Sequence, residues 1–125
     1  MIPTLLQIAL GGGTGAVARY LVGLGVTRIA GPGMPLGVMT ANILGSFLIG
    51  AFVVLAAHKS LTHLSPLVVT GFLGGFTTFS SFSLETVTLI ERGQTGTAAL
   101  YVLLSVGASL GALFLGLLAA RGIFA

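Results

Sequence analysis

Residues 71–85 hold the densest group of side chains that could handle an ion. Their sequence, GFLGGFTTFSSFSLE, contains three glycines, two threonines, three serines and the carboxylate of Glu85 inside an apolar stretch. A bilayer offers no water to loose backbone groups, so a helix interrupted there must be buried in protein or line an aqueous cavity. This segment is therefore predicted to form a functional site.

Two aromatic rings in this segment share a helix face, because Phe79 and Phe82 are three residues apart. The edge of an aromatic ring carries partial positive charge, so two inward-turned edges favour an anion without binding it as tightly as a fixed cation would. Ordinary packing is the alternative. Glu85 is either a pore-mouth or proton-linked acid or a paired structural one. Hydroxyl groups surround the rings at Thr78, Ser80, Ser81 and Ser83.

Two polar side chains fall inside earlier apolar segments. Arg19 is either a structurally paired or snorkelling arginine, or a fixed charge in a watery vestibule that attracts an anion. The amide of Asn42 carries two donors, so it could link helices or replace the hydration of a small anion. Both residues are candidates for the same site.

A polar stripe is predicted in the last apolar segment. Tyr101, Ser105 and Ser109 recur every four residues and so lie on one helix face. Serine in a membrane helix often bonds to its own backbone, which is the alternative to a polar track.

Several other functions are excluded or disfavoured. The chain has no Cys and no Asp, which leaves no enzyme constellation, and its two histidines fall in no metal motif. The spacing of Gly11, Gly13 and Ala16 matches a dinucleotide fingerprint, but the required acid about 20 residues later is absent. The pI of about 10.3 comes from scattered cations, so nucleic-acid binding is not expected.

The elements that position these residues are four apolar segments, expected as helices over about 3–30, 35–57, 66–90 and 97–120. Each can span a bilayer, which takes about 20 residues. The 125 residues are 55% hydrophobic and 6% charged, against roughly 25% charged in soluble domains. We predict one all-α, four-helix transmembrane domain over residues 1–125.

The loop charges are balanced. Arg28 and Arg92 belong to one side of the membrane, and Lys59 and Arg121 to the other, so the positive-inside bias vanishes. Either a short chain has few charges, or copies insert in both orientations and form an antiparallel dimer. Small residues spaced by four predict close helix packing: Gly11 and Gly15, Ser46 and Gly50, Gly71 and Gly75, Gly107 and Gly111.

Three segments resemble the Fluc family of small bacterial fluoride channels. These are GGTGAVARY at 12–20, NILGSFLIG at 42–50, and the segment at 71–85. The last match is the most specific. Ser81 departs from the threonine expected in many members, and Thr40-Ala41 replaces bulkier aliphatic residues.

The resemblance implies an antiparallel, dual-topology homodimer in the bacterial inner membrane, passively exporting fluoride through two pores. It places Asn42, Phe79, Phe82, Ser105 and Ser109 along the fluoride path. Tyr101 and Glu85 would join the same polar track, with Thr78 and Ser81 as neighbouring hydroxyls, and Arg19 would lie in a vestibule. The third helix would break near residues 74–77. Backbone carbonyls of Gly74 and Thr77 from both subunits would then bind a structural sodium ion.

Three alternatives remain at this point. A proton-coupled fluoride antiporter would use Glu85 as its coupler. A small multidrug-type dual-topology transporter needs an acid in the first segment, where this chain has Arg19 and no acid. A non-transporting assembly subunit would carry no ion.

Overall fold

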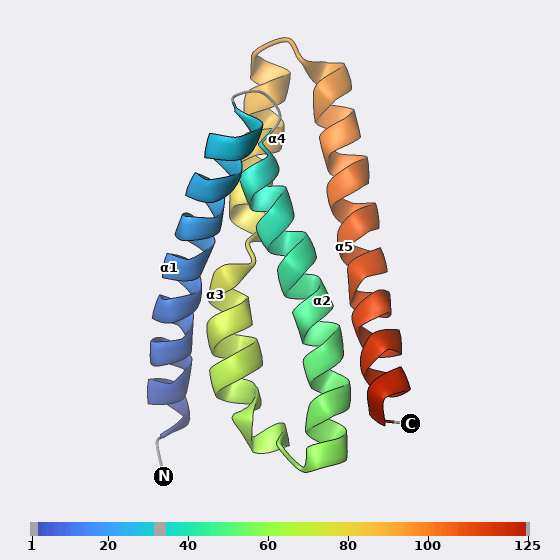
Figure 1. The fold of residues 1–125 in the computed structure, drawn as a ribbon. Coiled ribbons are helices and arrows are strands. Elements are labelled where there is room, and N and C mark those ends of the chain that lie inside the picture. Colours follow the sequence, from blue (N-terminus) through green and yellow to red (C-terminus); the bar gives the residue numbers. More distant parts are fainter. Residues whose placement is uncertain (1–2, 32–34, 125) are drawn as a thin grey trace.

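The computed structural model describes residues 3–31 and 35–124, which form an up-and-down bundle of four spans (Figure 1). The first two spans are α1 (Thr4–Ala30) and α2 (Leu36–Lys59), and the last is α5 (Thr95–Phe124). The third span runs through η1 (Thr62–Leu64), η2 (Pro66–Leu73), α3 (Gly74–Phe76) and α4 (Phe79–Glu91). The predicted all-α class with a broken third helix is confirmed. Residues 1–2, 32–34 and 125 of the predicted domain lie outside the described residues.

Two helices, α2 and α5, extend beyond the ranges expected from hydropathy, because the residues at their ends continue the helical backbone. α2 includes His58 and Lys59, and α5 begins at Thr95 and reaches Phe124. The turns between spans are short. Gly93 takes a positive φ of 77° between α4 and α5, a conformation that costs glycine little.

The break in the third span lies at Thr77 and Thr78, just past the two glycines expected to produce it. Gly74 remains helical, with φ −64° and ψ −36°, whereas Thr77 (φ −91°, ψ 155°) and Thr78 (φ −153°, ψ 125°) are extended. Both threonines are β-branched, which favours extended backbone. The Thr77 hydroxyl donates to the Leu73 carbonyl at 2.8 Å, and Thr78 Oγ1 accepts the Ser81 N–H at 3.1 Å, so α4 starts with a side-chain cap.

The segment before the break is π-helical, which the sequence pattern did not indicate. η2 begins at Pro66 and leads directly into α3. π-Helical turns are rare in proteins, and those that occur often lie at functional sites. The π-helical segment and the break that follows it therefore belong to the same span.

Glycines let two pairs of helices meet backbone to backbone. A Cβ atom at Gly50 would collide with the Leu113 carbonyl on α5, and one at Gly116 with the Phe47 carbonyl on α2. Gly15 on α1 similarly lies against the Phe72 carbonyl of η2. A Cβ at Gly107, by contrast, would meet no atom of the described residues within 4 Å. The small residues of the first three spans therefore pack within the chain, as expected.

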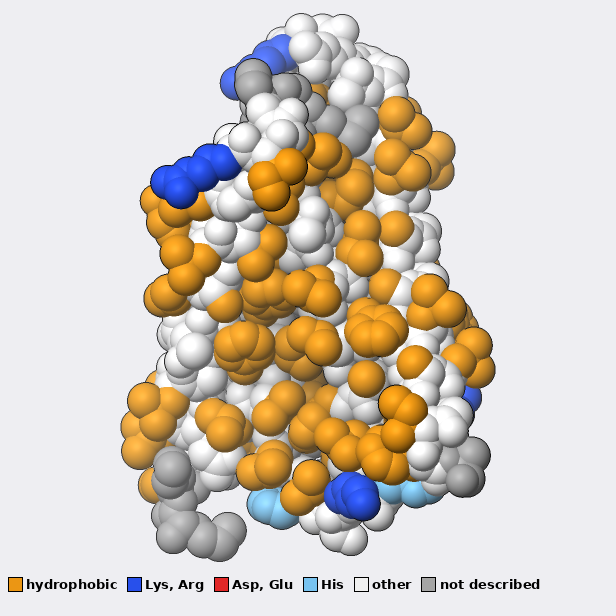
Figure 2. All heavy atoms as spheres, in the orientation of Figure 1, with side chains coloured by type: hydrophobic (Ala, Val, Ile, Leu, Met, Phe, Trp, Pro, Cys, Tyr) orange, Lys and Arg blue, Asp and Glu red, His pale blue; other side chains and the backbone are white. Residues whose placement is uncertain are grey.

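The outer surface is suited to lipid. Each of the four spans is long and apolar enough to cross a membrane. Figure 2 shows hydrophobic side chains over most of the visible flank, with Lys, Arg and His side chains toward its two ends. Both termini of the described chain lie at one end of the bundle, as an even number of spans requires (Figure 1).

Candidate functional site

The break and the two neighbouring spans enclose a groove of about 480 Å³, here called the Asn42 groove. It draws together residues predicted from three separate segments. α2 contributes Asn42, the third span contributes the break and the two aromatic rings, and α5 contributes the serine stripe. The lining residues are Asn42, Ser46, Ile49, Gly74, Thr77, Thr78, Phe79, Phe82, Ser105, Val106, Ser109 and Leu110.

The two rings differ in exposure. Phe82 is buried at 9% exposure and belongs to the chain's main apolar core with Met39, whereas Phe79 is 77% exposed in the single chain. Their ring centroids are 5.5 Å apart, with the planes tilted by 50°. Both rings line the groove, one from a buried side chain and one from an exposed side chain.

The serine stripe of α5 faces the same groove. Ser105 is buried at 4% exposure, and its hydroxyl lies near that of Tyr101 without a hydrogen bond of regular geometry among the described residues. Ser83 on α4, by contrast, donates back to the Phe79 carbonyl at 3.0 Å. A buried hydroxyl without a regular hydrogen bond is costly in apolar surroundings, which makes Ser105 a donor available to a bound ion or water.

Tyr101 connects this groove with a second cavity. It is fully buried, its ring lies 5.4 Å from that of Phe82, and its hydroxyl donates to Glu85 Oε1 at 3.1 Å. Glu85 is therefore a hydrogen-bonded acid rather than an isolated one. Ser81 lines neither of the two cavities; its N–H bonds to Thr78 Oγ1.

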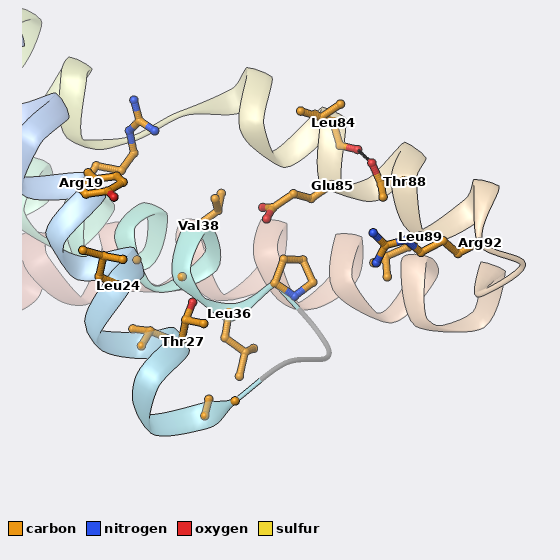
Figure 3. Close-up of a pocket in the computed structure, with 17 residues that line it drawn as sticks. Arg19, Leu24, Thr27, Leu36, Val38, Leu84, Glu85, Thr88, Leu89 and Arg92 are labelled. Carbon is orange, nitrogen blue, oxygen red and sulfur yellow. Dashed lines mark hydrogen bonds between the residues drawn. The ribbon is translucent and has the colours of Figure 1, made fainter.

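The second cavity, about 590 Å³ and here called the Arg19 cavity, lies between α1, α2 and α4. Figure 3 shows the Glu85 carboxylate between Arg19 and Arg92, and these three charged side chains line the cavity. Arg19 Nε also donates to the Gly75 carbonyl at 3.2 Å, at the end of the first half of the third span. Arg19 is therefore paired with backbone and also lines a cavity.

Some lining residues were not predicted as site residues. Ser46 lies one helical turn after Asn42, and its i+4 spacing was the available signal. Arg92 was assigned only to the loop charges, yet it lines the Arg19 cavity. Ile49, Val106 and Leu110 are apolar, and nothing in their types distinguishes them from packing residues.

Backbone carbonyls at the break fit a hard cation in their chemistry. The N–H of Thr78, which in a continuous helix would bond to the Gly74 carbonyl, donates to Asn42 Oδ1 at 2.7 Å. The N–H of Ser81, the helical donor for the Thr77 carbonyl, donates to Thr78 Oγ1. Both carbonyls have lost their regular donors, as carbonyl ligands for an ion must.

Comparison with known proteins identifies the family of the chain. Residues 6–117 match the family model described as CrcB-like protein, Camphor Resistance (CrcB). The chain is 66% identical to the fluoride-specific ion channel FluC of Ruegeria sp. (strain TM1040) over 124 residues, 98% of each chain. It is 58% identical to FluC of Roseobacter denitrificans and 50% identical to FluC of Agrobacterium fabrum, covering at least 94% of each chain. The chain is therefore a multi-pass membrane protein that belongs to the CrcB-like family of FluC ion channels.

Proposed function

We propose that this chain is a fluoride-specific ion channel of the bacterial cytoplasmic membrane, through which fluoride leaves the cytoplasm passively. It is not an enzyme. The observation that carries the proposal is the Asn42 groove, where an amide, hydroxyls and aromatic edges converge inside a membrane bundle without a charged side chain in the lining. The names of relatives up to 66% identical support the choice of fluoride.

The mechanism follows from the hydration of a small anion. Fluoride holds its water tightly, so it enters an apolar bundle only where protein donors replace that water. In the Asn42 groove these donors are hydroxyls such as that of Ser105, together with the edges of Phe79 and Phe82. No fixed cation lies in the lining, so the ion is bound weakly enough to leave.

The Arg19 cavity serves as the vestibule. Its two arginines and one glutamate give the lining a net positive charge, which raises the local concentration of anions. Tyr101, bonded to Glu85 and in contact with Phe82, forms the polar track between the vestibule and the groove.

The working unit is an antiparallel homodimer with two pores. Four spans are few to enclose a polar path, and Phe79, a ring that lines the groove, is 77% exposed in the single chain. A second copy would cover this side. The balanced loop charges support insertion in both orientations.

A structural sodium ion at the centre of the dimer completes the proposal. The carbonyls of Gly74 and Thr77 from both subunits would hold it. Their helical donors are engaged elsewhere, which supports their availability. The ion would join the two interrupted helices across the dimer and would not move with fluoride.

The test is reconstitution of the purified protein into liposomes, with efflux followed by fluoride- and chloride-selective electrodes. Rapid fluoride efflux without chloride efflux, and without a proton gradient, is expected. Protein-free liposomes give the leak. Flux that depends steeply on a proton gradient would instead support a fluoride antiporter coupled through Glu85.

No fluoride flux from a folded dimer would overturn the channel and would favour an assembly subunit or a multidrug-type transporter. The multidrug alternative is the weaker of the two, because α1 contains no acidic residue.

A further inference from the structure

Asn42 is bonded at both ends of its amide to one residue of the broken span. Its Oδ1 accepts the Thr78 N–H at 2.7 Å, and its Nδ2 donates to the Thr78 carbonyl at 3.0 Å. The two residues are 36 positions apart, on α2 and at the start of α4. A primary amide offers one acceptor oxygen and two N–H donors, so one N–H of Asn42 remains for the groove.

These two bonds have the donor and acceptor pattern of a peptide group. Inside a helical span, the N–H of an extended residue falls outside the helical ladder, and lipid supplies no water to replace its lost partner. Thr78 is the N-cap of α4, so its carbonyl still faces the first turn of that helix. The side chain of Asn42 satisfies both groups of Thr78 at once. No other neutral side chain except Gln carries an acceptor and donors in this arrangement, and Gln is longer.

The bond between Asn42 Oδ1 and the Thr78 N–H also determines where the helix that precedes Thr78 ends. If the Thr78 N–H were released, its nearest regular partner would be the Gly74 carbonyl, four residues earlier. The helix could then continue through residue 78. While Asn42 Oδ1 holds the N–H, the Gly74 carbonyl stays outside the helical ladder.

We infer that Asn42 is a positioning residue that keeps the third span interrupted, and that it thereby keeps the Gly74 carbonyl available to a cation. This rests on the proposed sodium site, and it gives Asn42 a role beyond that of an anion donor. Thr78 lines the Asn42 groove and is bonded to Asn42. It therefore links the pore to the cation site.

Other contacts near the break do not involve Asn42, so the bundle should still fold when Asn42 is lost. Thr78 Oγ1 caps α4 through the Ser81 N–H, and Arg19 Nε bonds to the Gly75 carbonyl. Losing Asn42 removes the acceptor of the Thr78 N–H and one donor to the Thr78 carbonyl. We therefore expect the loss of Asn42 to weaken cation binding at the break more than it weakens overall folding.

The experiment measures the melting temperature of the purified full chain in detergent, in sodium chloride and in N-methylglucamine chloride of equal ionic strength. Wild type should melt higher in sodium, because a ligand that binds only the folded state stabilises it. Asn42→Ala should lose this sodium-dependent rise. Ser109→Ala is the matched control, because Ser109 lines the same groove but has no hydrogen bond to Thr78 among the described residues. It should retain the rise.

Asn42→Asp separates the two bonds. Its remaining oxygen can still accept the Thr78 N–H, so the sodium-dependent rise should persist even though a carboxylate in the groove stops fluoride. This variant also serves if Asn42→Ala does not fold. The inference is overturned by an unchanged rise in folded Asn42→Ala, by loss of the rise in Asn42→Asp, or by no sodium response in wild type. Failure of the channel itself would appear separately, as absent fluoride efflux from wild-type liposomes.

Discussion

At the scale of single residues, the groove separates side chains with structural partners from those without. Backbone groups are hydrogen-bonded by the side chains of Asn42, Thr78 and Ser83. The buried Ser105 hydroxyl, by contrast, makes no hydrogen bond of regular geometry among the described residues. Phe82 is held in the core and Phe79 is exposed. Functional tests are sharpest at residues whose loss should change ion binding more than folding, namely Ser105 and Phe79.

Ser105→Ala should reduce fluoride efflux by about fivefold while changing the free energy of unfolding by no more than about 1 kcal/mol. The hydroxyl makes no hydrogen bond of regular geometry inside the described chain, so its removal costs little in the empty protein, but one donor to the ion, worth about 1 kcal/mol, is lost. Liposome efflux and detergent melting measure the two effects. Ser65→Ala, in the turn before η2, is the control. A normal rate in Ser105→Ala would remove Ser105 from the path.

Phe82→Ile should lower fluoride efflux by about tenfold and leave the dimer intact, because losing one contact worth about 1.4 kcal/mol to the moving ion slows passage about tenfold. Phe79→Ile should act in the same direction. Phe114→Ile on α5 is the control, since Phe114 is exposed and does not line the groove. The rates come from liposomes and the dimer from size-exclusion chromatography. Undiminished flux in both ring variants would exclude the aromatic edges from the mechanism.

At the scale of elements, the third span is the part that makes a site possible. A continuous helix would satisfy its own backbone and leave nothing for an ion. Here η2 widens, α3 ends after Phe76, and α4 restarts at Phe79 with a threonine cap. The helices around this break are held rigidly, because α2 and α5 touch backbone to backbone at Gly50 and Gly116.

Gly50→Ala should destabilise the bundle by about 1–3 kcal/mol, because the added Cβ would collide with the Leu113 carbonyl, and backbone cannot rotate away as a side chain can. Melting in detergent measures the loss. Gly111→Ala is the matched control on α5, where a Cβ would meet nothing within 4 Å among the described residues. Equal stability of the two variants would contradict the close α2–α5 packing.

At the scale of the whole molecule, the single chain leaves part of the lining of the Asn42 groove exposed. The ring of Phe79 lines the groove and is largely exposed, and the cationic residues are divided between the two ends of the bundle. Both features support a second copy in the opposite orientation, which would cover the groove and bring two broken spans together.

Two additional lysines beside Arg28 should drive insertion into one orientation and thereby lower fluoride efflux from cells, because antiparallel partners would no longer be made together. The positive-inside bias gives the direction. Accessibility of a terminal tag on either side of the membrane measures orientation. Co-expression with a second variant, which carries two added lysines beside Lys59 instead of beside Arg28, should restore efflux. Full activity of a uniformly oriented single variant would argue against the antiparallel dimer.

The sequence determined the class of molecule, because hydropathy and charge are properties of composition. Four apolar segments with seven formal charges can only be membrane spans, and polar residues inside them must have a use. The motifs at 42–50 and 71–85 indicated the family that the comparisons show. The predicted site residues were read from the same local patterns, since types and spacings along one helix decide which side chains share a face.

Only the tertiary structure decided how those faces meet. The break lies at Thr77 and Thr78 because Asn42, 36 residues earlier, captures the Thr78 N–H, and no local pattern contains that contact. Arg19 and Glu85 line a different cavity from the serine stripe, and Ser46 joins the groove because α2 packs against α5. These outcomes depend on contacts between distant segments, whose geometry is determined by packing and by the requirement that buried backbone groups find partners.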